Sequence, residues 1–366
     1  MPKVNLNFSG SSPPDLFVGR FNYPNVYAGI LSPAVHSEDS YKLSSPEEWF
    51  KDRLSIKEIL ENRGVMIYSR FTTNIKAEDN KLLKVMKEVS MASKPCDVEF
   101  VLKKKPVFKL NLDSVMPPIG NPAPLIKAKL RENPKIERGV EYAVSDYELK
   151  AKDALINLYK NNFKISDIIK LLSAGLLGIK KNRKLVPSRW AVTAVDSTVS
   201  NELLKEIKSL PLINEYMLFN DEYLGNHYEI ILMPGEWSFE VIEFNENKEF
   251  WHDYEFYEGK KEYASNVTGA YYANRLAVAE YLKKIKRQAS AIILREVRGE
   301  YNVPLGVGIL REVTRSALKR KGEEFKDIKD LFEEAEKRLR LNINLFLEKS
   351  ILLKKRIRQK RMFDYL

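Results

Sequence analysis

Several residue types are scarce in this chain of 366 residues, and each scarcity excludes a class of protein. The single cysteine, Cys96, excludes an intrachain disulfide and a zinc site built from a cysteine cluster. We expect it to serve as a small, buried apolar residue. The three histidines, His36, His227 and His252, do not show the spacing of metal ligands. We therefore predict no metal site and no evident cofactor, although a nucleotide ligand stays open.

Long apolar runs are also missing. No stretch approaches the roughly 18 residues that a membrane span needs. The first ten residues lack the charged-then-apolar layout of a signal peptide. Glutamine is scarce too, since Gln288 and Gln359 are the only two in the chain. Few Gln and Cys beside abundant Lys and Glu are typical of a thermophile. These features predict a cytoplasmic protein with no membrane partner.

What is abundant allows a large core and favours anionic partners. Hydrophobic residues make up 44% of the chain, and Lys plus Arg exceed Asp plus Glu by eleven. Such an excess suits DNA or nucleotides, but a lysine-rich solvated surface gives the same number. We predict an α+β fold, with one compact domain of mixed β-sheet and many helices over residues 1–348. A proline-rich internal boundary is a candidate at 117–134. A basic helical segment, 349–358, and a flexible tail, 359–366, complete the chain.

Local patterns place the individual elements. Capping boxes predict helices that start after Ser45, Ser55 and Ser145. Alternation of apolar residues predicts strands at residues 98–102, 108–112, 189–195, 227–233 and 237–241. Helical periodicity predicts a helix at 268–288 and an almost wholly helical chain from residue 323 onward.

The N-terminal region is a candidate phosphate-binding loop. It combines small hydroxyl residues, two glycines and a cation, namely Ser9, Gly10, Ser11, Ser12, Gly19 and Arg20. Backbone N–H groups, hydroxyls and a guanidinium are the groups that hold a phosphate. The region has no Gly-Lys-Thr or Gly-Lys-Ser ending, so it is not a Walker loop. An irregular loop without a ligand is the alternative.

The middle of the chain supplies candidate catalytic residues. A strand carrying Arg189, a further candidate for phosphate, leads through Asp196 to a helix predicted at 201–208. Anion-binding and catalytic groups collect at such helix starts, but an ordinary N-cap is the commoner explanation of these residue types. His227 and Glu236 are candidates for acid/base chemistry. Their alternatives are a structural histidine and a solvated glutamate.

The last eight residues form a compact anchor. Gln359 is followed by apolar and aromatic residues, which are Met362, Phe363, Tyr365 and Leu366. One tight turn would present these side chains to an apolar pocket on a partner, where aromatic anchors carry most of the binding energy. The alternative is a helix end that packs back onto the domain. Short motifs of this kind match by chance often.

Several blocks together resemble the archaeal Nre DNA-repair family. They lie at residues 8–14, 18–20, 190–196, 234–240, 268–272 and 305–307. The tail completes the resemblance, because it looks like the box that docks repair proteins onto the PCNA sliding clamp. It departs from the commonest box in ending on Leu366 where a second aromatic is usual. Some relatives carry a cysteine-rich zinc module that this chain lacks, which puts a zinc-dependent DNA contact in doubt.

The resemblance implies DNA repair at PCNA, and two kinds of activity stay open. One is an enzyme that acts on a nucleotide, ADP-ribose or a nucleic-acid phosphate through the residues named above. The other is a non-enzymatic, DNA-binding adaptor that brings partners to the clamp, as the net charge of +11 suggests.

Overall fold

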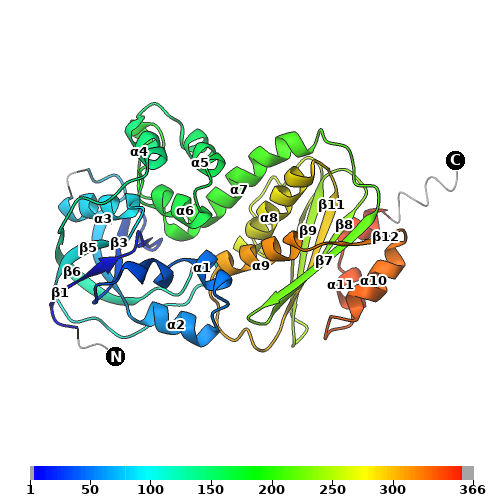
Figure 1. The fold of residues 1–366 in the computed structure, drawn as a ribbon, viewed down its shortest axis with the longest axis horizontal. Coiled ribbons are helices and arrows are strands. Elements are labelled where there is room, and N and C mark those ends of the chain that lie inside the picture. The colour runs from blue at the N-terminus through cyan, green and yellow to red at the C-terminus, as the bar shows by residue number, and fades with distance from the viewer. Residues whose placement is uncertain (1–3, 79, 357–366) are drawn as a thin grey trace. The chain divides into compact units, whose positions relative to one another are not determined.

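Two six-stranded sheets, each with its own helices, make up the fold (Figure 1). The computed structural model describes residues 4–78 and 80–356. Unit 1 consists of Met1–Val199 and Pro304–Gly308, and unit 2 consists of Ser200–Val303 and Ile309–Leu366. The α+β fold class predicted from the sequence is confirmed. The proline-rich segment 117–134 lies inside unit 1.

The sheet of unit 1 has the strand order β1-β5-β6-β4-β3-β2. Its strands are β1 (Asn7–Ser12), β2 (Leu16–Val18), β3 (Asn25–Pro33), β4 (Met66–Asn74), β5 (Cys96–Leu102) and β6 (Asn121–Leu130). Neighbours are antiparallel except β4 and β6, which run parallel. The sheet curls so that β1 approaches the end of β3. The N–H of Ser11, on β1, donates to the carbonyl of Val35, just beyond β3, over 3.1 Å. The first strand therefore lies beside the end of the third.

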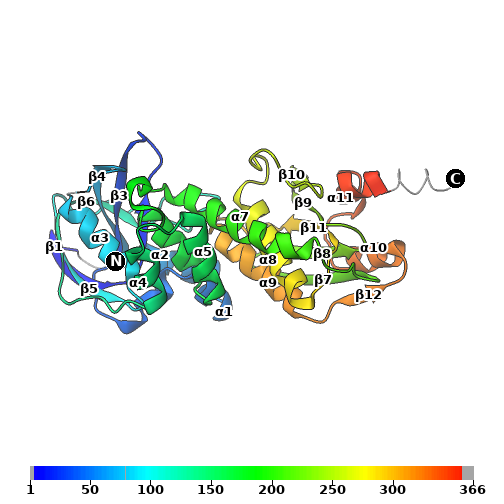
Figure 2. The same cartoon turned by 90° about the horizontal axis from the view of Figure 1, so that it is seen from above.

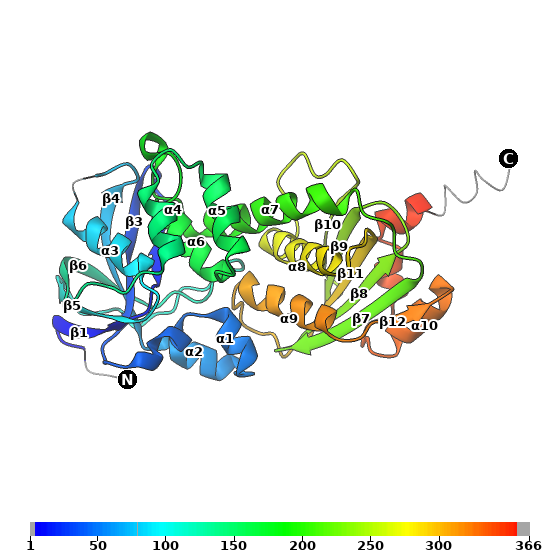
Figure 3. The same ribbon diagram turned by 45° about the horizontal axis from the view of Figure 1, so that its top comes forward.

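Six helices within residues 46–173 accompany this sheet. They are α1 (Pro46–Lys51), α2 (Ile56–Gly64), α3 (Lys81–Met91), α4 (Arg138–Ser145), α5 (Ala151–Lys160) and α6 (Ile165–Ser173). Helix α3 packs on β3 and β6, and α6 packs on α3 and β2. Helix α5 contacts both α4 and α6 (Figure 3). The predicted starts of α1 and α2 are confirmed, and Ser55 forms its capping box with Glu58.

The sheet of unit 2 has the order β10-β9-β11-β8-β7-β12, in which only β9 and β11 run parallel. Its strands are β7 (Tyr216–Tyr223), β8 (Asn226–Met233), β9 (Ser238–Asn245), β10 (Phe250–Glu255), β11 (Ser290–Val297) and β12 (Glu323–Phe325). The strands β8 and β9 match the predictions. Every residue of β8 is buried, as expected when helices cover both faces of a sheet.

Helices lie on both faces of this second sheet (Figure 2). Helix α8 (Gly269–Ile285) lies on one face, where Tyr271 meets Phe239 edge to face. Helices α10 (Ile328–Glu336) and α11 (Asn344–Leu347) pack on the other through an apolar core that includes Ile231, Leu331 and Phe346. Burying each such side chain contributes about 1.5–3 kcal/mol. Among the described residues, no helix has the length and apolarity to span a bilayer.

The strand predicted at 189–195 is wrong. These residues lie in the 20-residue helix α7 (Ser188–Ile207), which begins in unit 1 and continues into unit 2. The β-branched and aromatic residues that suggested a strand are spaced for one helix face, because Ala191, Val192, Val195 and Val199 are buried while Trp190 is exposed. Helix α9 (Val307–Lys319) likewise has residues in both units.

Three further predictions need correction. Residues 108–112 form no strand, and only one isolated bridge, from Asn111 to Ile119, occurs there. Ser145 ends α4, and Asp146 instead accepts hydrogen bonds from the N–H groups of Glu148 and Leu149 in the turn before α5. The chain from residue 323 onward first forms the short strand β12 before it turns helical.

Candidate functional site

The predicted N-terminal phosphate loop is largely a β-strand. Residues 7–12 form β1, whose N–H and C=O groups pair with β5. The Ser9 hydroxyl lies 2.9 Å from Nε2 of His36, and Nδ1 of His36 lies 2.9 Å from Oδ1 of Asp97. Ser11 donates to the same carboxyl over 2.7 Å. This bond and the neighbouring His36 lower the pKa of Asp97, against the effect of its burial. Two of the predicted phosphate ligands therefore already have protein partners.

Gly10 has a packing role in this strand. A Cβ atom at this position would lie 1.9 Å from the carbonyl oxygen of Pro33, which is far inside contact distance. The chain therefore needs glycine here so that β1 can approach the end of β3. Ser12 has no exposed surface, so its hydroxyl is not presented to solvent. These residues do not form an open cradle for an anion.

The two predicted phosphate-binding arginines differ in their surroundings. Arg20 is exposed in the loop after β2, next to Gly19, with its guanidinium 5.3 Å from the ring centre of Phe21. Arg189 lies at the start of α7 and forms a short ion pair with Asp113. A carboxylate partner already offsets the charge of Arg189. Arg20 is thus the better placed of the two to meet an external anion.

The three candidate catalytic residues do not form one constellation. Asp196 is fully buried in the middle of α7, so it is neither the N-cap nor the helix-start residue that the sequence suggested. His227 is near the start of β8, whereas Glu236 follows the end of that strand. Six residues of extended chain separate His227 from the last residue of β8, roughly 20 Å. An acid/base pair of His227 with Glu236 is excluded by this separation.

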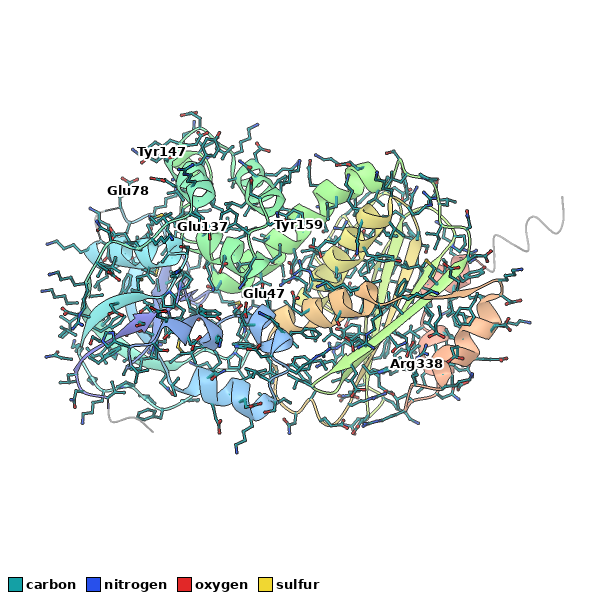
Figure 4. All side chains as sticks on the ribbon, in the orientation of Figure 1. Glu47, Glu78, Glu137, Tyr147, Tyr159 and Arg338 are labelled. Atoms are coloured by element: carbon teal, nitrogen blue, oxygen red, sulfur yellow. The ribbon has the colours of Figure 1, made fainter. Side chains whose placement is uncertain are left out.

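His227 belongs to a buried ion network. Its Nε2 lies 2.9 Å from Oε1 of Glu229, and its Nδ1 lies 3.5 Å from Oε2 of Glu222. Glu229 also accepts a hydrogen bond from Nε of Arg338, which follows α10 and is labelled in Figure 4. Glu229 has no exposed surface, so its charge needs these partners. The network links β8 to the helical layer on that face.

Unit 1 contains a cleft that sequence patterns did not indicate. Its volume is about 690 Å³, within the range of ligand pockets. Segments far apart in the sequence line it, namely 38–45, 90–96, 132–140 and 163–171. Glu137, labelled in Figure 4, is the N-cap residue of α4 on this wall. No local motif joins these segments, so only the fold reveals the cleft.

The cleft presents charges of both signs. Four lysines line it, Lys94, Lys135, Lys164 and Lys170, together with five acidic residues. Burial lowers the pKa of Lys164, but its 2.9 Å bond to Glu48 outweighs this and leaves the pKa raised. The lysines could contact phosphate oxygens, and the ring of Phe163 could contact an apolar group. The cleft thus suits a ligand that carries both a phosphate and an apolar group.

Cys96 also lines this cleft, where its surroundings disfavour the reactive thiolate. Burial is the main cause that raises the pKa of its thiol, to about 12. The expectation that it is a buried apolar residue is confirmed by its 3% exposure. Within residues 4–78 and 80–356, no cluster of three or more His, Cys, Asp or Glu side chains is arranged to hold a metal ion.

A smaller cleft of about 240 Å³ lies in unit 2. Glu236, in the turn before β9, and Ser238, the first residue of β9, line one side. Lys355 and Arg356 line it from the helical residues 351–356. Arg356 donates to the carbonyl of Pro234 over 2.8 Å. The structure therefore places the block 234–240 against the segment that leads to the C-terminal tail. The predicted anchor, Gln359 to Leu366, lies outside the described residues.

Comparison with known proteins gives consistent matches over the whole chain. Two family models match, "Archaeal Nre, N-terminal" over residues 2–252 and "Archaeal Nre, C-terminal" over residues 255–365. The DNA repair protein NreA of Archaeoglobus fulgidus is 40% identical, covering 92% of this chain and 86% of that protein. NreB of the same organism is 37% identical, covering 99% and 93%.

A third relative comes from another archaeon. The DNA repair protein NreA of Haloferax volcanii is 36% identical, covering 84% of this chain and 77% of that protein. No solved structure matches the chain. The two family models meet inside β10, so their junction is not the boundary between the two units.

Proposed function

Because the chain belongs to the archaeal Nre family of DNA-repair proteins, we propose that it works at the PCNA sliding clamp, which it binds through residues 359–366. The observation that carries this proposal is the way the body ends. The helical residues 351–356 are fixed to unit 2, and the box follows within three residues. Because residues 351–356 are packed against unit 2, a partner that binds residues 359–366 would hold the whole folded body beside it.

Apolar packing and hydrogen bonds to one buried carboxylate attach residues 351–356 to unit 2. Leu352 and Leu353 are buried in the apolar core of unit 2. The carboxylate of Glu240, on β9, accepts hydrogen bonds from the Ser350 hydroxyl and from the N–H of Ile351 at 2.7 Å. A carboxylate at the N-terminus of a helix also meets the positive end of the helix dipole.

The two glutamines of the chain, Gln288 and Gln359, differ in whether a structural role explains their presence. Gln288 is buried, and its side-chain oxygen accepts a hydrogen bond from the N–H of Trp237 over 2.9 Å. Its amide nitrogen donates to the carbonyls of Lys208 and Leu210. Packing therefore explains Gln288, whereas Gln359 stands at the head of the box. This contrast supports a binding role for Gln359.

Single substitutions in the box test the proposal. Tyr365→Ala and Leu366→Ala should each weaken binding to the clamp by about 30-fold, the loss that corresponds to a 2 kcal/mol hot spot. Lys360→Ala is the matched control in the same segment, and it should change affinity by less than about threefold, as a rim charge does. Isothermal titration against the clamp of the same organism measures all three. Equal affinities for wild type and both anchor variants would refute recruitment by this box.

DNA is the second partner of this proposal, and the basic residues before the box support it. Residues 349–361 carry Lys349, Lys354, Lys355, Arg356, Arg358, Lys360 and Arg361 with no acidic residue. Lys354 and Lys355 are exposed on the fixed helical segment. Neutralising phosphates releases counterions, so the logarithm of DNA affinity should fall linearly with the logarithm of salt concentration.

The cleft of unit 1 supports a second candidate function, the binding of a nucleotide or ADP-ribose. Its size and its lysines are the observations that favour it. A ligand present at 100 times its Kd stabilises the folded protein by about 2.7 kcal/mol, which a thermal melt detects. ADP, ATP and ADP-ribose should be tried on wild type and on Lys164→Ala, with the exposed Lys181→Ala as control. If none of them raises the Tm of the wild type, the cleft does not bind this class of ligand.

A further inference from the structure

Four aromatic side chains of unit 1 are exposed at one hairpin and the helix start beside it. Phe21 is 75% exposed, Tyr23 41%, Tyr27 44% and Trp190 45%. Three of them lie on or beside the loop that joins β2 to β3, and Trp190 lies in the first turn of α7. Exposed aromatic groups that gather in this way mark an interaction site.

The fold holds this cluster in place. The N–H of Val18, at the end of β2, donates to the hydroxyl of Ser188, the first residue of α7, over 2.9 Å. This buried bond fixes the start of the helix against the hairpin. The rings of Tyr23 and Trp190 then meet with their centres 5.5 Å apart. The N–H of Gly19 donates to the carbonyl of Tyr27 over 2.8 Å and closes the loop.

Two arginines accompany the aromatic rings. The guanidinium of Arg20 lies 5.3 Å from the ring centre of Phe21, and that of Arg70 lies 4.3 Å from the ring centre of Tyr27. Both distances are within the range of cation–π contacts. In the described part of the chain, neither guanidinium is paired with a carboxylate. Two positive charges are thus left to meet an external anion.

The close approach of β3 and β4 positions Arg70. Gly29 pairs with Arg70 across the two strands, and a Cβ at Gly29 would lie 2.8 Å from the Cα of Arg70. Tyr27 is two residues before Gly29 on the same side of the strand. Only a residue without a side chain at 29 leaves room for the Arg70 backbone, with its guanidinium over the ring of Tyr27.

We propose that these six residues, Arg20, Phe21, Tyr23, Tyr27, Arg70 and Trp190, form a surface that binds unpaired DNA, and we call it the aromatic–arginine surface. This inference rests on the proposed function in DNA repair. Aromatic rings stack on bases whose faces are free, and arginines meet the phosphates between them. In a duplex the faces of the bases are covered by their neighbours, so the rings would have nothing to stack on. The surface therefore selects single-stranded over double-stranded DNA.

Fluorescence anisotropy with a labelled 12-nucleotide strand and with the same sequence as a duplex tests the proposal. The wild type should bind the single strand at least about tenfold more tightly, since stacking acts on each exposed base. The double variant Phe21→Ala/Trp190→Ala should lose about tenfold or more in single-strand affinity and less than about twofold in duplex affinity. Tyr142→Ala, an exposed tyrosine on α4, is the matched control and should bind as the wild type does.

The arginines and the tryptophan give independent readouts. Arg20→Ala and Arg70→Ala should each reduce the slope of log affinity against log salt by about one. Binding of the strand should quench the fluorescence of Trp190, and Trp190→Phe should remove that quenching. All substituted side chains except Arg70 are exposed, so melting temperatures should stay close to wild type and serve as a folding check.

Three outcomes would overturn the proposal. They are equal affinity for single strand and duplex, an unchanged single-strand affinity in the double variant, and binding to anionic lipid vesicles without binding to the strand. Clamp binding is measured on the same variants. If it persists while single-strand binding fails, the aromatic–arginine surface is refuted and recruitment to the clamp stands.

Discussion

Gly10→Ala is expected to destabilise the protein by about 3 kcal/mol or more, at the upper end of the cost of overpacking. The added methyl group would lie 1.9 Å from the carbonyl oxygen of Pro33 and 3.0 Å from that of Val35. Both obstacles are backbone atoms, so neither can turn away as a side chain would. The strand β1 would have to separate from the end of β3. A thermal melt should show a Tm lowered by about 10 °C, given 2–4 °C per kcal/mol for a unit of this size.

Gly64→Ala is the control for this substitution. A Cβ at Gly64, the last residue of α2, would have no atom within 4 Å, so alanine should be neutral or slightly stabilising there. The pair also separates two roles for Gly10. If Gly10 served an anion site and not packing, Gly10→Ala would melt like the wild type and would lose only ligand binding. That result would contradict the placement of β1.

Glu240→Ala is expected to release the helical residues 351–356 from the sheet. The buried carboxylate of Glu240 accepts hydrogen bonds from His252, from Ser350 and from the N–H of Ile351. Removing it leaves these donors without their acceptor, at about 1–3 kcal/mol for each group that stays buried. The total, about 3–5 kcal/mol, is that of breaking a buried charged pair.

Hydrogen exchange is the appropriate measurement for this variant. The amides of Ile351 and Leu352 should exchange much faster in Glu240→Ala, because local opening no longer breaks a bond to the carboxylate. Glu236→Ala, four residues earlier and exposed, should leave their exchange unchanged. Unchanged exchange in both variants would mean that Glu240 does not hold this segment. The box itself is intact in Glu240→Ala, so clamp binding should survive.

Strands with strong alternation could be predicted from the sequence. The pattern at 237–241 appears as β9, where Trp237 and Phe239 are fully buried. The helix α8 and the capping box at Ser55 were equally clear, because both rest on local periodicity and local hydrogen bonds. Where a single segment determines its own structure, the sequence is informative.

The errors arise where distant segments decide the structure. Residues 189–195 contain aromatic and β-branched side chains, but the burial of Ala191, Val192 and Val195 stabilises a helix that local propensity does not favour. β1 has the serine and glycine content of a loop and is followed by two prolines, yet it pairs with β5, which lies some ninety residues away. Contacts with partners far along the chain override weak local preferences.

In the candidate site, too, single residues could be predicted from the sequence, but contacts between distant segments could not. Individual residues such as Arg20 and Glu236 were found as chemically capable groups, and both are exposed. Their neighbours could not be found, because four separate stretches line the cleft of unit 1. Likewise, the contact of Tyr23 with Trp190 joins two segments far apart in the sequence, which the bond of Val18 to Ser188 also connects. The His36–Asp97 contact also joins residues that no motif connects.

The measurement that most directly tests recruitment to the clamp is a titration of PCNA with the full chain and with a chain that ends at residue 358. The full chain should bind with measurable affinity, and the shortened chain should show no binding at the same concentrations. The Tm of the two should agree, because the box is predicted not to be part of the core. Clamp binding that persists in the shortened chain, or a large fall in its Tm, would contradict the account.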